Sequence, residues 1–331
     1  FFFFKQKTAY EIVDCDWSSD VCSSDLLSVA DAMSDAPVIA VLGGLGLIIG
    51  SFLNVCIYRI PAEKSIVTPG SHCACGKPVA WHDNIPILSW LILRGRARCC
   101  GRPFSIRYPA IELLTALLFV ACWVAFPGEP GNAVCGWVLV SMLVAGSFID
   151  LDHMIIPEVF TIGLGLVGVL LSFAVPSLHG QHSGLFLVDS MRSGLQAILG
   201  LIVGSGFILW FVLIMEALLK KEAMGLGDVK LVGAICAFTG WQGAFTALAG
   251  GSAIGLVWFA VAMLRQKLTG EKSNAGLKVE TPEGQPADIG FSVHVPFGPM
   301  ISIAGALHFL WLHRWVDVLV EQARYVFLFQ P

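Results

Sequence analysis

Two short acidic motifs stand out in a chain that carries few charges. Asp150 and Asp152 lie two positions apart, and Asp228 follows Gly225 and Gly227 in the run GLGD. Two adjacent carboxyl groups resist ionising together, so one keeps its proton as a general acid while the other acts as a base on water. Paired in this way, they could cleave a peptide bond. The alternative is that they are ordinary interfacial residues, with Asp228 as a helix N-cap.

The residues around Asp228 favour the catalytic interpretation. Gly225 and Gly227 allow unusual backbone angles and the close approach of another chain, which an enzyme that cuts an extended peptide needs. We therefore predict supporting roles for Gly225, Gly227 and Lys230 in this motif. Asp152 is a further supporting residue, close enough to Asp150 to compete for the same role.

Four cysteines form a second candidate site. Cys73, Cys75, Cys99 and Cys100 cluster in a polar segment, whereas Cys56, Cys122, Cys135 and Cys236 lie in apolar stretches. Clustered thiols on the cytosolic side favour a metal over disulfides. We predict a structural zinc site, although the spacing departs from the usual pair of C-x2-C turns. Free thiols are the alternative, and His72 could replace one ligand.

Composition decides what kind of protein positions these residues. Hydrophobic residues make up 56% and charged residues 13%, and mean hydropathy is +0.76, against roughly 25% charged residues in an average soluble domain. A soluble globule, a disordered chain and a disulfide scaffold are excluded. We predict an all-α polytopic membrane protein with about eight transmembrane helices and a small cytosolic cysteine-containing lobe after the first helix.

The expected spans follow from apolar stretches near the roughly 20 residues that cross a bilayer. They lie near 37–57, 109–126, 133–149, 158–176, 194–219, 229–241, 243–264 and 296–313. Residues 1–26 resemble translated sequencing-adapter read-through and are set apart from the fold. The remaining predicted segments are the first transmembrane helix with its approach (27–60), the Cys- and Arg-rich lobe (61–108), the seven-helix membrane domain (109–313) and a C-terminal tail (314–331).

Lys and Arg residues indicate the orientation. Fifteen of the twenty gather in alternate connections: eight between the first and second spans, three after the fifth, and four after the seventh. The basic side should be cytosolic. Asp150 at the end of the third span and Asp228 at the start of the sixth would then both lie at cytosolic helix ends, where they could meet.

Taken in order, the motifs resemble those of the type IV prepilin peptidase family, bifunctional leader peptidases and N-methyltransferases of the GxGD intramembrane aspartyl protease class. The resemblance covers residues 40 to 313, nearly the whole chain outside its ends. Its motifs are GSFLNV at 50–55, YRIP at 58–61, DNIP at 83–86, LSW at 88–90, RYP at 107–109, EL at 112–113, FIDLDH at 148–153, GLGDVKL at 225–231 and PFGP at 296–299.

The resemblance implies that Asp150 and Asp228 are the catalytic pair, with Asp150 favoured over Asp152. It implies an endopeptidase of the bacterial inner (plasma) membrane with its active site facing the cytosol. The substrates would be prepilins, or pseudopilins of type II secretion, cut after the leader's terminal glycine. Besides this substrate and the lipid bilayer, we expect no nucleic-acid partner.

The resemblance also implies that the new N-terminus is methylated, with S-adenosylmethionine as the cofactor. Where the family pattern has the first of its four lobe cysteines this chain has His72, and where the pattern has the third it has Ala97. Both departures lie in the region that the family associates with methylation. A single-function peptidase is therefore an alternative. No glycine-rich Rossmann fingerprint locates a methyl-donor site. A rival from another class is a transporter or assembly scaffold with proton- or cation-binding acids, but the inverted repeats it predicts are not visible.

Overall fold

The computed structural model describes residues 36–73, 75–220, 224–269 and 296–328. Within these ranges the regular elements are helices, together with two isolated β-bridges in the lobe. The predicted tail at residues 1–26, and residues 27–35 of the following segment, lie outside the described residues. The prediction of an all-α polytopic fold is confirmed.

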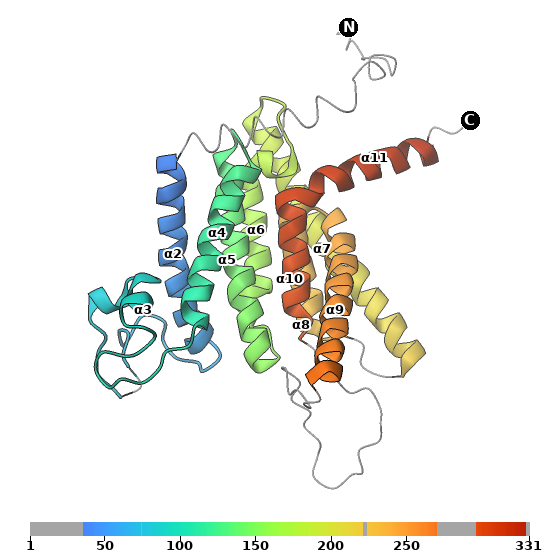
Figure 1. The fold of residues 1–331 in the computed structure, drawn as a ribbon. Helices are drawn as coiled ribbons and strands as arrows, with labels where there is room; N and C mark the ends of the chain where they lie inside the picture. The colour runs from blue at the N-terminus through green and yellow to red at the C-terminus, as the bar shows by residue number, and fades with distance from the viewer. Residues whose placement is uncertain (1–35, 74, 221–223, 270–295, 329–331) are drawn as a thin grey trace.

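The helices are arranged side by side as a bundle, with the lobe at one end and the last helix turned away at the other (Figure 1). In chain order the elements are α2 (Ala36–Arg59), the 3-10 turn η2 (Trp81–Asn84), α3 (Leu88–Ile92), α4 (Arg107–Ala125), α5 (Pro130–His153), the 3-10 turn η3 (Glu158–Phe160), α6 (Ile162–Ala174), the 3-10 turn η4 (Pro176–His179), α7 (Phe186–Leu219), α8 (Leu226–Thr239), α9 (Gln242–Thr269), α10 (Gly298–Leu307), the π-helical turn η5 (His308–Leu312) and α11 (His313–Leu328).

Fewer described helices than the eight predicted are long enough to span a membrane. Six described helices are long and apolar enough to cross a bilayer: Ala36–Arg59, Arg107–Ala125, Pro130–His153, Phe186–Leu219, Gln242–Val261 and Gly298–Val320. The other two predicted spans correspond to α6 and α8, which have only 13 and 14 residues. The count of eight is therefore not confirmed, although each predicted span coincides with a helix.

The short helix α8 lies in the core of the bundle. It packs against α6, α7, α9 and α10, and nine of its residues are buried. Small residues on its neighbours allow this packing: a side chain at Gly200 of α7 would place its Cβ only 2.4 Å from the Cys236 carbonyl oxygen. Because protein surrounds α8, the helix need not be as long as one that faces lipid.

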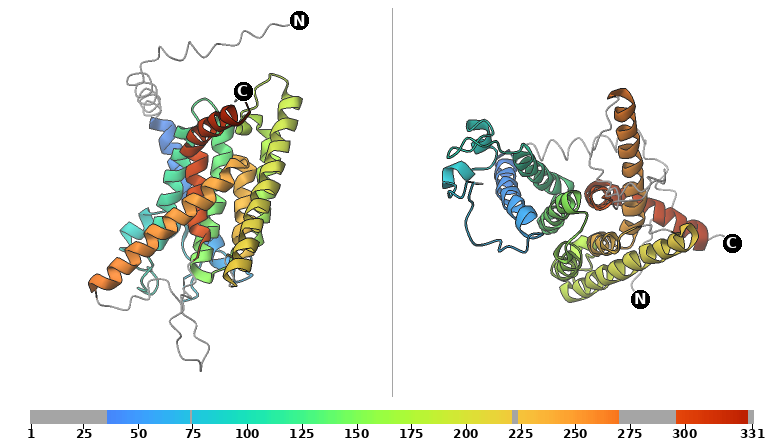
Figure 2. Two further views of the ribbon diagram at one scale, coloured as in Figure 1. Left: turned by 90° about the vertical axis from the view of Figure 1, so that its right-hand side faces the viewer. Right: turned by 90° about the horizontal axis from the view of Figure 1, so that it is seen from below.

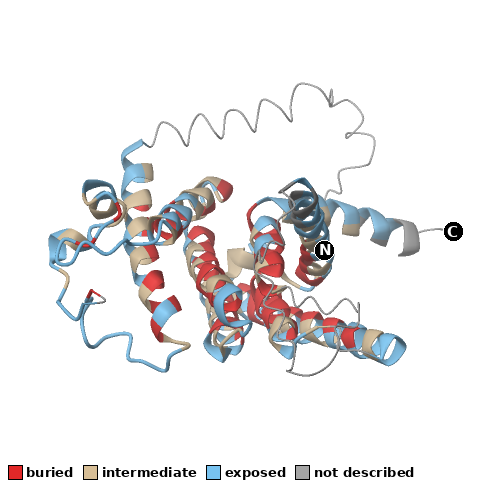
Figure 3. Ribbon diagram, turned by 60° about the horizontal axis from the view of Figure 1, so that its bottom comes forward, coloured by how far each residue is buried: buried red, intermediate tan, exposed pale blue. Residues whose placement is uncertain are grey.

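The outer helices cover this centre. Figure 2 shows α9 slanting across the bundle, and Figure 3 shows buried residues on the faces where helices meet. Residues 314–328 of the predicted C-terminal tail belong to α11, which begins directly after the π-helical turn η5. At the opposite end, the lobe connects α2 to α4.

Candidate active site

The end of α5 and the start of α8 bring Asp150 and Asp228 together at one end of the bundle. Asp150 lies in the last turn of α5 and is 6% exposed. Asp228 lies in the first turn of α8 and is half-buried. The two carboxyl groups interact electrostatically, and α5 and α8 are in contact. The 77 residues between them thus fold back to place both acids in one site.

One oxygen of the Asp150 carboxyl group is buried without a polar partner. Its Oδ2 atom is buried and has no hydrogen-bond partner among the described residues. The nearest wall is Gly298 at the start of α10, where an added Cβ would lie 2.7 Å from that oxygen and 2.8 Å from Cδ1 of Ile156. A buried polar atom without a partner costs free energy. This arrangement is typical of a reacting group rather than a structural one.

The sequence did not single out Gly298 and Ile156 as part of the site. Ile156 also lies beside Gly227, 3.8 Å from the position of an added Cβ, so it packs against a glycine at the start of α8 and one at the start of α10. Gly298 belongs to the PFGP motif, whose position in the chain gives no indication of contact with Asp150. Only the packing of α10 against α5 reveals it.

The predicted role of Gly225 needs a correction. Gly225 precedes α8 with φ −68° and ψ 144°, a conformation open to any residue, so no unusual backbone angle is present there. An added Cβ at Gly225 would lie 3.8 Å from Asp228 Oδ2, an ordinary contact. Because Gly225 has no side chain, the space beside the Asp228 carboxyl group stays open.

The other predicted supporting residues are held in ion pairs. Asp152 Oδ1 lies 2.6 Å from Nη1 of Arg107, whose Nη2 donates to the Phe148 carbonyl oxygen at 3.2 Å. Lys230 Nζ lies 3.0 Å from Oε1 of Glu158. Asp152 is exposed and directed to a cation, unlike Asp150. The two aspartates, between which the residues alone could not choose, therefore differ in burial and in pairing with a cation.

The four lobe cysteines form a compact cluster. Their sulfur atoms all lie within 4.8 Å of one another, with Cys73 Sγ 3.5 Å from Cys100 Sγ and Cys75 Sγ 3.4 Å from Cys99 Sγ. Zinc–sulfur bonds of about 2.3 Å in a tetrahedron separate sulfurs by roughly 3.8 Å. The cluster could therefore bind a metal ion. The hydrogen bond from the Cys75 main-chain N–H, followed by those from Cys99 and Cys100, lowers the pKa of the Cys73 thiol to about 7.

Two tight turns present these cysteines. The Cys73 N–H donates to the Lys77 carbonyl at 2.8 Å, and the Ala97 N–H donates to the Arg102 carbonyl at 2.8 Å. His72, predicted as a possible substitute ligand, lies outside the cluster, with its Nδ1 atom 3.1 Å from the Gly70 carbonyl oxygen. Despite the irregular spacing, the turns supply four thiols without His72.

Polar contacts fix the lobe to the bundle. Glu112 of α4 accepts a hydrogen bond from the Ile87 N–H of the lobe at 2.7 Å, and Asn54 of α2 donates to the Tyr108 carbonyl of α4 at 3.2 Å, which joins the two helices that the lobe connects. Within the lobe, the hydrogen bonds from Arg98 hold the pKa of Asp83 below its usual range. The Arg107–Asp152 pair then links the end of the lobe to the end of α5.

The fold and this site define a multi-pass helical membrane protein with two interacting carboxyl groups at one end of its bundle. The Bacterial Peptidase A24 N-terminal domain matches residues 45–126, and the Type IV leader peptidase family matches residues 137–260. The second match contains both Asp150 and Asp228. The chain belongs to the type IV leader peptidase family, which confirms the resemblance.

Several curated relatives are similar over most of the chain. A prepilin leader peptidase/N-methyltransferase of Myxococcus xanthus is 41% identical over 73% of this chain and 67% of the relative. A type 4 prepilin-like proteins leader peptide-processing enzyme of Escherichia coli is 40% identical over 62% of this chain and 77% of the relative. A prepilin leader peptidase/N-methyltransferase of Aeromonas hydrophila is 34% identical over 81% and 90%. No solved structure matches the chain.

Proposed function

We propose that this chain is an aspartic endopeptidase that removes the short basic leader of type IV prepilins or type II secretion pseudopilins. The observation that carries the proposal is Asp150: its Oδ2 atom is buried without a partner, and its charge acts on Asp228. Family membership and the names of the relatives support the substrate class.

In the proposed reaction, water attacks the peptide bond that follows the leader. The ionised member of the Asp150 and Asp228 pair takes a proton from water, whose oxygen then bonds to the carbonyl carbon. The protonated member donates its proton to the nitrogen of the leaving amine, and the carbon–nitrogen bond breaks. The products are a leader with a new carboxylate and a mature chain with a new N-terminal amine.

The position of the site matches a substrate that is half inside the membrane. Asp150 and Asp228 lie at the end of the bundle next to the basic lobe. We propose that this end faces the cytosol of a bacterial inner membrane, so that the leader stays in the cytosol and the apolar helix of the prepilin lies in lipid. Glu158 and Asp152, at the same end, are already paired with cations.

Incubating the purified full-length protein with a prepilin should produce a mass loss equal to the leader. We expect Asp150→Asn or Asp228→Asn to abolish this cleavage while the protein still accumulates in the membrane. Glu63→Gln, which changes an exposed carboxylate of the lobe, is the matched control and should retain cleavage. Full cleavage by either active-site variant would disprove the assignment.

The proposal extends to methylation of the new amine, because the names of the Myxococcus and Aeromonas relatives pair the two activities. S-adenosylmethionine would supply the methyl group. The described residues contain no β-sheet, so a Rossmann-type site is not formed by them, and no residue is assigned to the donor. Adding S-adenosylmethionine to the cleavage reaction should give a further methyl-sized mass gain; its absence would favour a single-function peptidase.

We also propose that Cys73, Cys75, Cys99 and Cys100 hold a structural zinc ion. Their compactness supports this, since the sulfurs of four unrelated surface thiols have no reason to converge within 4.8 Å. When bound, zinc would cross-link the two turns of the lobe, which has little buried apolar surface of its own. A metal in this position stabilises the fold rather than taking part in peptide cleavage.

A further inference from the structure

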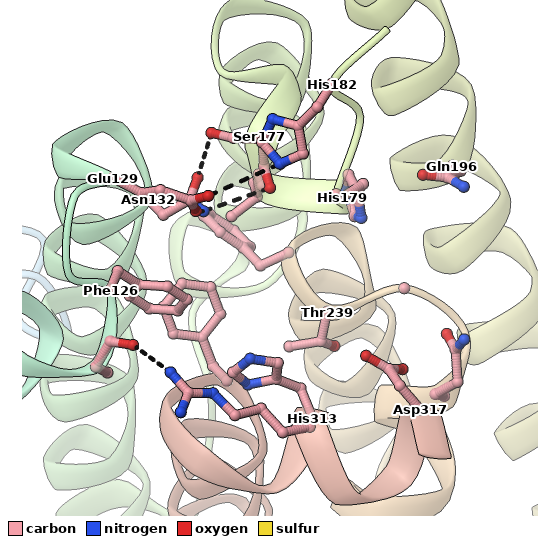
Figure 4. A pocket seen from close by; sticks show the side chains of 18 of the residues that line it. Phe126, Glu129, Asn132, Ser177, His179, His182, Gln196, Thr239, His313 and Asp317 are labelled. Atoms are coloured by element: carbon pink, nitrogen blue, oxygen red, sulfur yellow. Dashed lines mark hydrogen bonds and ion pairs between the residues drawn. The ribbon is translucent and has the colours of Figure 1, made fainter. Parts of the chain in front are cut away.

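A cavity lies at the end of the bundle opposite Asp150 and Asp228. Its volume is about 680 Å³, within the size range of pockets that take small molecules. Its walls come from segments far apart in the sequence: the α4–α5 connection, the start of α5, η4 and the loop after it, α7, the α8–α9 turn and the start of α11 (Figure 4). Neither the proposed peptide cleavage nor the lobe uses this cavity.

The length of α5 fixes the depth of the cavity in the membrane. Asn132 lines the cavity near the start of α5, and Asp150 lies near its end. At 1.5 Å per residue the two are about 27 Å apart along the helix, close to the roughly 30 Å thickness of the hydrocarbon core. If Asp150 lies at one membrane surface, the cavity therefore lies at the headgroup layer of the other.

Aromatic and amphipathic residues mark the same level. Trp241 lines the cavity and is 42% exposed, and Trp311 and Trp315 nearby are 50% and 71% exposed. Exposed tryptophans gather at membrane–water interfaces. After η5, α11 turns away from the bundle (Figure 1) and exposes Val318 and Leu319. An amphipathic helix in this orientation is typical of one that lies along the lipid surface.

Charges of both signs face the cavity without neutralising each other. Arg314 and Asp317, one turn apart on α11, both line it, and Figure 4 shows Asp317 directed into it. Arg314 Nη2 donates to the Ala125 carbonyl at 3.2 Å, which leaves its other N–H groups available. Asp317 interacts electrostatically with His313 but forms no hydrogen bond or ion pair with any described residue. A ligand with one anionic and one cationic group would match them.

The remaining lining residues fit an amphipathic ligand. Phe126, Leu199 and Phe309 provide apolar surface, whereas on another wall Glu129 Oε1 lies 3.7 Å from Nε2 of His182. A purely anionic ligand would face the carboxylates of Glu129 and Asp317, and a purely cationic one would face Arg314. The chemistry therefore favours a zwitterion with an apolar tail over a ligand of a single charge.

We propose that this cavity binds the headgroup of a zwitterionic phospholipid that carries a phosphate and a primary ammonium, such as phosphatidylethanolamine. The phosphate contacts Arg314, the ammonium contacts Asp317, and the acyl chains leave the cavity toward the bilayer beside Trp241. α11 positions both charged residues and holds them at headgroup depth. The inference concerns residues outside the proposed catalytic site and does not depend on peptide cleavage.

The test is lipid binding by the delipidated full-length protein, measured by native mass spectrometry. Phosphatidylethanolamine and phosphatidylglycerol with identical acyl chains are titrated in parallel. We expect a preference for phosphatidylethanolamine of about tenfold, the size of one charge-assisted hydrogen bond. Asp317→Asn should remove the preference, because only the ethanolamine lipid has an ammonium, and Arg314→Gln should weaken both lipids, because both have a phosphate.

Arg192→Gln is the matched control. Arg192 lies near the start of α7, at the cavity end of the bundle, is exposed, and does not line the cavity. It should bind both lipids as the parent does, and size-exclusion chromatography checks that every variant is folded. The proposal would be overturned if the parent protein bound the two lipids equally and Asp317→Asn left that binding unchanged. Displacement by soluble phosphoethanolamine at the concentration at which the lipid itself competes would overturn the lipid assignment in favour of a free solute.

Discussion

Three carboxylates near the end of α5 have different surroundings. Asp152 is paired with Arg107, and Glu158 is paired with Lys230. Asp150 has an oxygen without a partner among the described residues, and it interacts electrostatically with another acid, Asp228. The cations at this end thus neutralise the two carboxylates outside the proposed catalytic pair. Among the described residues, no ion pair with a cation is formed by Asp150 or Asp228.

Gly298 is the residue whose side chain would most directly disturb Asp150. In Gly298→Ala, the new Cβ would lie 2.7 Å from Asp150 Oδ2, closer than such atoms pack, so the carboxyl group must move. Because a displacement of about 1 Å can reduce a reaction roughly 100-fold, we expect leader cleavage to fall by about that factor. Gly206→Ala, with open space around the added Cβ, is the control. Parent-like cleavage by Gly298→Ala would show that the wall beside Asp150 is not rigid.

Arg107 is expected to act through Asp152. Removing the cation in Arg107→Ala leaves Asp152 as an extra negative charge near the pair, and we expect a loss of cleavage of about fivefold, from an exposed ion pair worth up to about 1 kcal/mol. In the double variant with Asp152→Asn, that charge is absent and cleavage should partly recover. Prepilin cleavage by the single and double variants measures this. If the double variant is no better than Arg107→Ala alone, Arg107 acts only through its bond to Phe148.

At the scale of elements, hydropathy predicted the order of the helices well. Each apolar stretch became a helix because backbone groups in lipid must be satisfied within the segment. Hydropathy could not predict that α6 and α8 would be short, since a helix surrounded by protein and one surrounded by lipid are equally apolar. It also left 314–331 as a tail, because α11 has only one apolar face and no span-like run.

The lobe is the element whose stability we expect to depend on a metal. Purified protein should contain about one zinc per chain, because four thiolates in a tetrahedron bind the ion tightly. Cys75→Ser or Cys99→Ser should lower the zinc content several-fold, as measured by elemental mass spectrometry. Cys56→Ala, in α2, and His72→Ala, bonded to the Gly70 carbonyl, are the controls. A correctly folded protein that contains no zinc would contradict the prediction and favour the alternative, in which the four cysteines are free thiols.

At the scale of the whole molecule, the two candidate sites lie at opposite ends of the bundle. The candidate catalytic pair and the lobe lie at one end, and the cavity and α11 lie at the other. Sequence motifs pointed to the first end, because GLGD and FIDLDH each carry their chemistry in a few adjacent residues. Nothing comparable marks the second end: Asn132, Ser177, Gln242 and Asp317 come from separate segments and meet only in the folded chain.

The direction in which these ends face is testable with single thiol probes. Val67→Cys places an exposed thiol in the lobe, where the native side chain is 77% exposed, and Leu185→Cys places one before α7, where it is 66% exposed. Because Lys and Arg gather on the lobe side, that side should be retained in the cytosol. In intact spheroplasts a membrane-impermeant maleimide should label Leu185→Cys above the parent level and label Val67→Cys only after permeabilisation. The reverse pattern would place Asp150 and Asp228 outside the cell and separate them from a cytosolic leader, whatever their geometry.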